Sequence, residues 1–171
     1  MNLQDYFILP RGNSSEILVA KERSHLGEDW DKAYYGLLAE GFSMPTLRNF
    51  VDRLNHLKTG NVYDGNRERF TPSDLLDDIL TVRNPYRAEW LDARFIQYNG
   101  VMNIVYHRMN QSSREEVFEP LNDCLMENKQ IDLNYWLANA TPQGLPPKDT
   151  PSGNLGYWYP RDGAVARFVA S

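Results

Sequence analysis

The dipeptide Asn99-Gly100 constrains the fold of this chain more than any other feature of its sequence. It lies between two runs of alternating β-branched and aromatic residues. Asn-Gly is the strongest short signal for a two-residue type I′ β-hairpin turn, because both central residues of that turn need positive φ. The sequence therefore predicts an antiparallel hairpin over residues 90–109, with Tyr98 paired to Val101.

This register divides the strand residues between two faces, because successive side chains of a strand alternate. One face is the more apolar and is predicted to pack on the core; its pairs are Leu91–Arg108, Ala93–Tyr106, Phe95–Ile104 and Gln97–Met102. The other face is half polar, and we expect it to face water or a small covering segment. Asp92 lies opposite His107 on this second face.

Three amphipathic helices are predicted between about Asp29 and Arg83, because apolar residues recur there with a 3.6-residue period. The first helix has Asp29 as its N-cap, and the second opens with Pro45 in its first turn. The third helix has Thr71 as its N-cap. We expect all three apolar stripes to pack on the apolar face of the central hairpin.

Weaker patterns complete the predicted fold. They are a small hairpin over 6–20, a short hairpin over 60–70, a helix of about two turns starting near Pro120, a strand or a short helix over 130–138, a Pro/Gly-rich surface loop or lid over 140–154, and a terminal hairpin made of GYWY and AVARFV. No internal repeat or boundary divides the chain. The prediction is therefore an α+β fold in a single domain, residues 1–171.

The composition bounds the classes of partner. The net charge is −5 and the pI is near 5.2, which disfavours a whole-surface attraction to nucleic acid or to an anionic membrane. Cys124 is the one cysteine, so no intrachain disulfide can form. No apolar run approaches the about 18 residues of a membrane-spanning helix, and the first residues lack a basic leader. We expect a cytoplasmic protein that has no contact with a membrane.

Asp92 and His107 form the most chemically suggestive pair. Directly opposed residues in an antiparallel ladder have Cβ atoms roughly 4.5–5.5 Å apart, so the carboxylate can fix the imidazole. Arg94 and Glu89 lie nearby in sequence, and Arg87 lies just upstream. This group suggests a small enzyme that uses an Asp92/His107 acid–base pair, or a holder for a phosphate group. A cross-strand ion pair on a solvated sheet face explains the same residues.

A helix-turn-helix is a second possibility for residues 30–58. In that motif the second helix enters the major groove of DNA, and Arg48 and Arg53 would lie on its outer face. Phosphate contacts supply most of the affinity for DNA, and an acidic chain is poorly suited to provide them. A plain helical hairpin explains the same pattern.

An aromatic platform near the C-terminus is a third possibility. Tyr157, Tyr159 and Arg161 are of the types that stack on bases or sugars. Since neighbouring strand residues point to opposite faces, only the two tyrosines would share a side. An aromatic segment that closes the core explains them equally.

Specific catalytic signatures are absent from the sequence. There is no P-loop, no dinucleotide fingerprint and no G-x-S-x-G motif, and the histidines His25, His56 and His107 have no paired spacing for a metal. We therefore expect neither a metal nor a cofactor. The favoured interpretation is a non-catalytic binding protein whose partner is another protein, since aromatic and arginine residues are typical of interaction surfaces.

Overall fold

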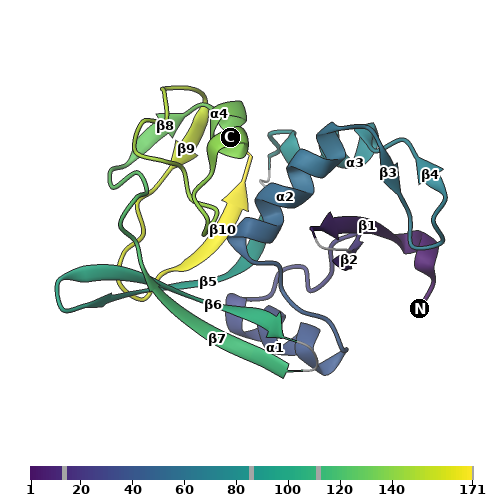
Figure 1. Ribbon diagram of the computed structural model, residues 1–171, viewed down its shortest axis with the longest axis horizontal. Coiled ribbons are helices and arrows are strands. Elements are labelled where there is room, and N and C mark those ends of the chain that lie inside the picture. The colour runs from purple at the N-terminus through teal and green to yellow at the C-terminus, as the bar shows by residue number, and fades with distance from the viewer. Residues whose placement is uncertain (13–14, 85–86, 111–112, 171) are drawn as a thin grey trace.

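The computed structural model describes residues 1–12, 15–84, 87–110 and 113–170. Its elements in chain order are η1 (Leu3–Asp5), β1 (Tyr6–Arg11), β2 (Ser15–Ala20), α1 (Trp30–Ala39), α2 (Leu47–Lys58), β3 (Val62–Tyr63), β4 (Arg69–Phe70), α3 (Ser73–Leu80), β5 (Ala88–Tyr98), β6 (Val101–Asn110), β7 (Ser113–Pro120), β8 (Lys129–Ile131), α4 (Leu133–Asn139), β9 (Leu155–Tyr157) and β10 (Val165–Val169). The mixed α+β class predicted from the sequence is confirmed (Figure 1).

The predicted central hairpin is present, and its inner pairs have the predicted register, whereas the predicted outer pairs Leu91–Arg108, Asp92–His107 and Ala93–Tyr106 are not part of the ladder. β5 and β6 pair antiparallel, with Tyr98 opposite Val101 and the ladder running to Arg94 opposite Val105. Asn99 and Gly100 both have positive φ, +53° and +76°, as a type I′ turn requires. The hairpin belongs to a four-stranded sheet of order β10-β5-β6-β7.

One face of the hairpin is buried in the core, as predicted, and the other face is partly buried as well. Leu91, Ala93, Phe95 and Ile104 are buried in the main core. The opposite face is not uniformly solvated, because Asp92 is only 3% exposed. A buried carboxylate on that face needs hydrogen-bond partners, which the site described below provides.

Side chains cap the N-termini of α1 and α2 but not that of α3, and two of the three N-caps differ by one residue from the predicted start. The side chain of Asp29 accepts a hydrogen bond from the backbone N–H of Lys32 at 2.8 Å, so the predicted cap of α1 is confirmed. α2 is capped by Thr46 and not begun by Pro45, because the threonine hydroxyl satisfies the N–H of Asn49. α3 has Pro72, not Thr71, at its N-cap and no side-chain cap.

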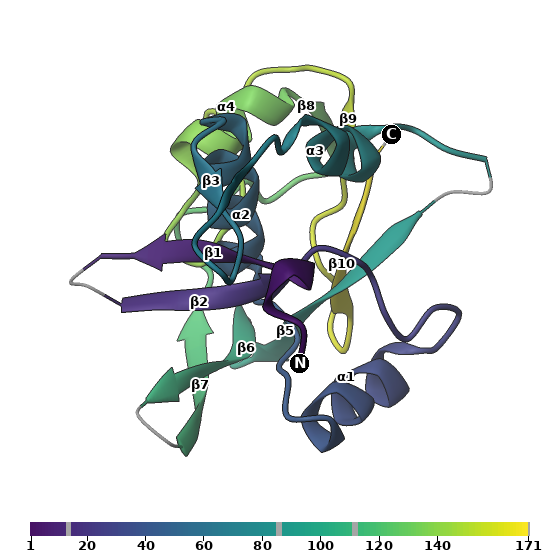
Figure 2. The same ribbon diagram turned by 90° about the vertical axis from the view of Figure 1, so that its right-hand side faces the viewer.

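The helices do not form one layer on one sheet, as the sequence suggested. α2 is the central helix and packs against α3, α4, β5 and β1. α1 lies apart from α2 and α3 in both views (Figures 1 and 2), and its buried residues form a small separate cluster around Trp30 and Tyr34. The sheets are small and separate, so each helix finds a different partner surface.

Residues 121–128 contain no helix, which corrects the predicted helix of about two turns starting near Pro120, and the segment that ends at Pro120 is strand β7. β7 pairs antiparallel with β6 along its length and forms an edge of the sheet. Pro120 ends this edge strand. Proline has no N–H to donate, and at this position the ladder does not need one. After Pro120, the backbone N–H groups of Leu121 and Leu125 donate to the oxygens of Met102 and Pro146, so contacts with distant segments override the local helical pattern.

The C-terminal third also departs from its predicted pairing. β9 pairs with β8, whereas β10 pairs with β5, so GYWY and AVARFV do not form a hairpin with each other. Residues 130–138 were predicted to be either a strand or a short helix, and they contain both. The end of β8 is followed by α4, which has Asp132 as its N-cap. The loop after α4 buries Leu145 and Thr150 and is therefore not simply a surface loop.

The N-terminal elements follow the sequence. β1 pairs with β2, and β3 pairs with β4, as the two predicted small hairpins require. Within the part of the chain that the structure describes, none of the helices has the length and apolar character needed to cross a membrane.

The central turn gives a first testable prediction. Replacing Gly100 by Ala places a Cβ at φ +76°, so we expect the free energy of unfolding to fall by about 1–2 kcal/mol. Urea unfolding followed by circular dichroism measures this change. Gly12→Ala is the matched control, because Gly12 has no positive φ and no neighbouring atom within 4 Å of an added Cβ. Equal stability of the two variants would contradict the turn assignment.

Candidate functional site

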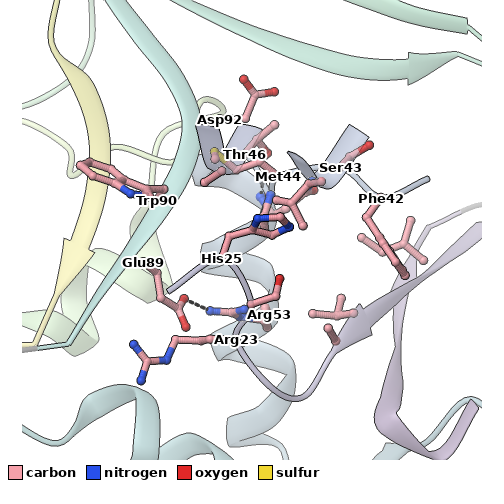
Figure 3. Close-up of a pocket in the computed structure, with 18 of the residues that line it drawn as sticks. Arg23, His25, Phe42, Ser43, Met44, Thr46, Arg53, Glu89, Trp90 and Asp92 are labelled. Carbon is pink, nitrogen blue, oxygen red and sulfur yellow. Dashed lines mark hydrogen bonds and ion pairs between the residues drawn. The ribbon is translucent and has the colours of Figure 1, made fainter. Parts of the chain in front are cut away.

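A large open cleft runs between the N-terminal hairpin, the loops on either side of α1, the start of α2 and strand β5. Its volume is about 1370 Å³. Figure 3 shows side chains from these different segments turned toward the same space, including His25, Ser43, Arg53 and Glu89. The cleft is thus assembled from segments that are distant in sequence.

The cleft is positively charged although the chain is acidic. Among the described residues that line it, nine are basic and six are acidic, which gives a net charge of +3 with histidine neutral. The whole chain has 18 basic and 23 acidic residues. Half of the basic residues therefore gather in this cleft, and such a concentration attracts anions.

Two buried arginines meet around Glu89 in the floor of the cleft. The side chains of Arg53, Arg87 and Glu89 are 10%, 7% and 11% exposed. One carboxylate oxygen of Glu89 accepts a hydrogen bond from Nη2 of Arg87 at 2.9 Å, and the other accepts from Nη2 of Arg53. Nη1 of Arg87 donates to the backbone oxygen and the carboxylate of Asp78. Glu89 thus bridges two guanidinium groups.

Neither buried arginine has all of its donors satisfied. The Nε atoms of Arg53 and Arg87 are buried and have no hydrogen-bond partner. A buried donor without an acceptor costs about 1–3 kcal/mol, more for a charged group. These two N–H groups are therefore left without the acceptors that buried polar groups normally have.

Arg23 adds a third guanidinium to this group. It extends from the loop after β2 and lies beside Arg53 and Glu89 in Figure 3. The pKa of Arg23 is lowered, first by desolvation and then by the charge of Arg87, while Glu89 opposes this effect. We refer to Arg23, Arg53, Arg87 and Glu89 as the arginine cluster.

Asp92 and His107 form a second group that lines the cleft. One oxygen of Asp92 accepts the backbone N–H of His107 at 3.0 Å, and the other lies 3.1 Å from its Nδ1. The hydroxyl of Tyr34 is 3.1 Å from the same Nδ1, and Arg114 donates to that hydroxyl. Burial raises the pKa of Asp92, and the hydrogen bonds from His107 oppose this shift.

The arrangement permits proton transfer in principle. An Nδ1–H held by Asp92 leaves Nε2 of His107 as the proton acceptor, and this atom lies 3.6 Å from the exposed carboxylate of Glu116. The same contacts also have a structural role, because the carboxylate of Asp92 supplies an acceptor to β6 beyond the end of the β5–β6 ladder.

The four residues predicted as catalytic separate into different surroundings. Asp92 and His107 lie together as predicted. Glu89 belongs to the arginine cluster, and Arg94 pairs with exposed Asp31 of α1 at 3.3 Å. Arg94 thus lies on the same α1 side as His107, which Tyr34 of α1 contacts, but its charge is paired with Asp31 and not with Asp92.

The two arginines expected on a DNA-reading helix do not form an outward positive face. Arg53 is buried against Glu89. Arg48 donates to the carboxylate of Asp52 and to the backbone oxygen of Thr141, at 2.8 and 3.0 Å from its Nη2 and Nη1. α2 also packs against α3, α4, β5 and β1.

The aromatic residues near the C-terminus are used in packing. Tyr157 and Tyr159 pack against the main core, and the hydroxyl of Tyr157 donates to the backbone oxygen of Leu125 at 2.8 Å. Arg161 is exposed, whereas burial raises the pKa of both tyrosines. The predicted stacking platform is therefore not assembled from these three residues.

Sequence reasoning missed two members of these groups. Arg23 lies in a segment that has only the character of a polar connection, and Tyr34 was assigned to the apolar stripe of a helix. No local signal marks either residue, because Glu89 and His107 reach them across more than 60 positions of sequence. The described residues include no group of three His, Cys, Asp or Glu side chains that could hold a metal ion.

No protein-family model, curated protein or solved structure matches this chain.

The buried carboxylate gives a second prediction. Replacing Asp92 by Ala leaves the backbone N–H of His107 without its acceptor, so we expect the free energy of unfolding to fall by about 1–3 kcal/mol. Asp92→Asn retains one oxygen for that N–H and an amide that can donate to Nδ1, so its loss should be smaller. Urea unfolding at neutral pH measures both values. Similar stability of both variants and the wild type would show that this carboxylate does not support the sheet.

His25, at the mouth of the cleft, gives a third prediction. Its Nδ1 and Nε2 lie 2.9 and 3.0 Å from the carboxylates of Glu28 and Glu40. The hydrogen bond that His25 donates to the carboxylate of Glu28 is the main cause that raises the pKa of His25, and desolvation opposes it. A raised folded pKa stabilises the fold below the unfolded pKa of about 6.5, and this stabilisation disappears as the pH rises through the folded value.

We therefore expect the wild type to gain stability over His25→Gln near pH 5.5 and to lose that advantage at alkaline pH. Urea midpoints across this pH range measure the difference. His56→Gln is the matched control, because burial lowers the pKa of His56 and should make the difference change in the opposite direction. A pH-independent difference for His25→Gln would contradict the ion-pair assignment.

Proposed function

We propose that this chain is a non-catalytic binding protein that accepts a small-molecule ligand in its cleft. The observation that carries the proposal is the gathering of basic residues in one large cleft of an otherwise acidic chain. Ligand sites are concave and combine apolar surface with a few placed polar groups. Met44, Trp90 and Ile79 supply apolar surface beside the arginine cluster.

The size of the cleft supports the same proposal. Pockets for small molecules usually have volumes of roughly 300–1,000 Å³, and the cleft exceeds this range because it is open along one side. Its lining comes from segments that are tied to one another, since Nε1 of Trp90 donates to the backbone oxygen of Glu28 at 3.0 Å. A site of this kind is largely formed before a ligand enters.

A protein partner is a second proposal, and a different surface supports it. Tyr98, Val101 and Phe118 share the outer face of the central sheet and are 62%, 41% and 50% exposed. Clustered exposed apolar residues are typical of protein interaction sites. We retain the cytoplasm as the proposed location, because Cys124 is a buried free thiol.

The two alternatives from the sequence have weaker support. An acid–base enzyme rests on the contact between Asp92 and His107, and the need of the sheet for a buried acceptor explains that contact equally well. A helix-turn-helix needs an uncovered second helix with outward arginines, whereas Arg53 is buried.

Native mass spectrometry of the isolated chain tests ligand binding in the cleft. We expect a mass excess from a bound small molecule after incubation with a small-molecule extract of cells. Ser43→Trp should remove it, because Ser43 is exposed at the cleft and the indole would fill the space. Asn122→Trp places the same ring on an exposed position that does not line the cleft and should keep the excess. A wild-type chain without adduct, or an adduct that Ser43→Trp retains, would refute the proposal.

A further inference from the structure

We infer that the arginine cluster binds the phosphate group of a phosphorylated small molecule. This inference rests on the proposed ligand cleft and names the chemistry of the ligand within it. It is carried by unpartnered buried donors, by the charge of the cluster and by the position of Glu89.

The donors are the first step. Arg53 is 8% exposed and the side chain of Arg87 7% exposed, and each has a buried Nε–H with no acceptor while it lines the cleft. Guanidinium groups offer several N–H donors in a rigid plane that matches the oxygens of phosphate. A phosphate that binds beside Glu89, with a side-chain shift that uncovers the two buried N–H groups, would supply the acceptors that they lack.

The charge balance is the second step. Within the described part of the chain, the three arginines of the cluster and the neighbouring Arg83 interact with two carboxylates, those of Asp78 and Glu89. The group therefore has a net charge of +2. A phosphate monoester has a charge of about −1.5 to −2 at neutral pH, which compensates this excess.

The position of Glu89 is the third step. Its two oxygens accept from different arginines, so the carboxylate fixes the planes of both guanidiniums before any ligand is present. Without this bridge the two buried cations would repel each other. Glu89 is therefore a positioning residue that holds the donors, and Arg23 is the exposed cation of the cluster.

A purely structural role explains the cluster less well. An ion-pair network that only supports the fold has its buried donors satisfied, because each unsatisfied one lowers stability. Here both buried arginines keep an unsatisfied N–H, and desolvation and the charge of Arg87 lower the pKa of exposed Arg23 beside them. An anion bound at the arginine cluster would accept hydrogen bonds from the unsatisfied N–H groups and would favour the positive charge of Arg23.

Isothermal titration calorimetry of the full chain with inorganic phosphate and with phenyl phosphate, at constant ionic strength, tests the inference. We expect both probes to bind the wild type and Arg23→Gln to weaken binding at least about tenfold, as expected for the loss of a charged hydrogen bond. Arg161→Gln, which removes an exposed arginine that does not line the cleft, should bind as the wild type does.

Arg87→Gln tests the buried donors directly. We expect it to abolish phosphate binding while circular dichroism shows the wild-type spectrum. If this variant does not fold, the exposed Arg23→Gln variant still decides the question, because its side chain supports no buried packing.

Each contrary outcome has a distinct meaning. Phosphate binding that is equal in the wild type and in Arg23→Gln would overturn the inference. Absence of phosphate binding in a chain that still carries an adduct sensitive to Ser43→Trp would also overturn it, but would leave the ligand cleft intact. Absence of both the adduct and phosphate binding would overturn the proposed function together with the inference.

Discussion

At the point where β5 leaves its ladder with β6, the carboxylate of Asp92 accepts the hydrogen bond that a backbone oxygen would accept in a continuous ladder. The rest of the structure depends on this side-chain acceptor. The ladder ends at Arg94 opposite Val105, yet the N–H of His107 is satisfied by the Asp92 side chain at 3.0 Å. The backbone N–H of Asp92 is thereby free to donate to the oxygen of Pro45 at 2.7 Å. The strand can therefore bend without leaving buried polar groups unpaired.

The bend of β5 places the two functional groups of the cleft. Adjacent residues Val165 and Ala166 of β10 pair with Arg94 and Leu91, so β5 contains extra residues at this point, as in a β-bulge. Bulges redirect side chains and strengthen the local twist. Before the bend, Glu89 points to the arginines of the cleft floor; at the bend, Asp92 points to β6. In a straight strand Glu89 and Asp92 would point to opposite faces, whereas here both line the same cleft.

Sequence reasoning succeeded where the determining forces are local. The turn at Asn99-Gly100 fixed the register of β5 and β6 because positive φ is a property of two adjacent residues, and the cap at Asp29 is similarly local. It failed where partners are distant in sequence. Arg53 has the pattern of an exposed helical residue, but Glu89 lies 36 positions away and draws it into the interior. Similarly, Pro120 ends a strand because β6 offers an edge, which no pattern around Pro120 reveals.

The energetics of the arginine cluster favour a role in binding over a role in stability. Burying two guanidiniums requires the loss of their hydration, and replacement of a buried ion pair by apolar residues of similar volume is often neutral or stabilising. Glu89 compensates part of this loss, but the unsatisfied Nε–H groups of Arg53 and Arg87 add to it. A fold that needed only stability would be served better by apolar side chains at these positions. The excess positive charge in the cleft has a physical benefit once an anion binds, because the anion supplies both the missing acceptors and the missing charge.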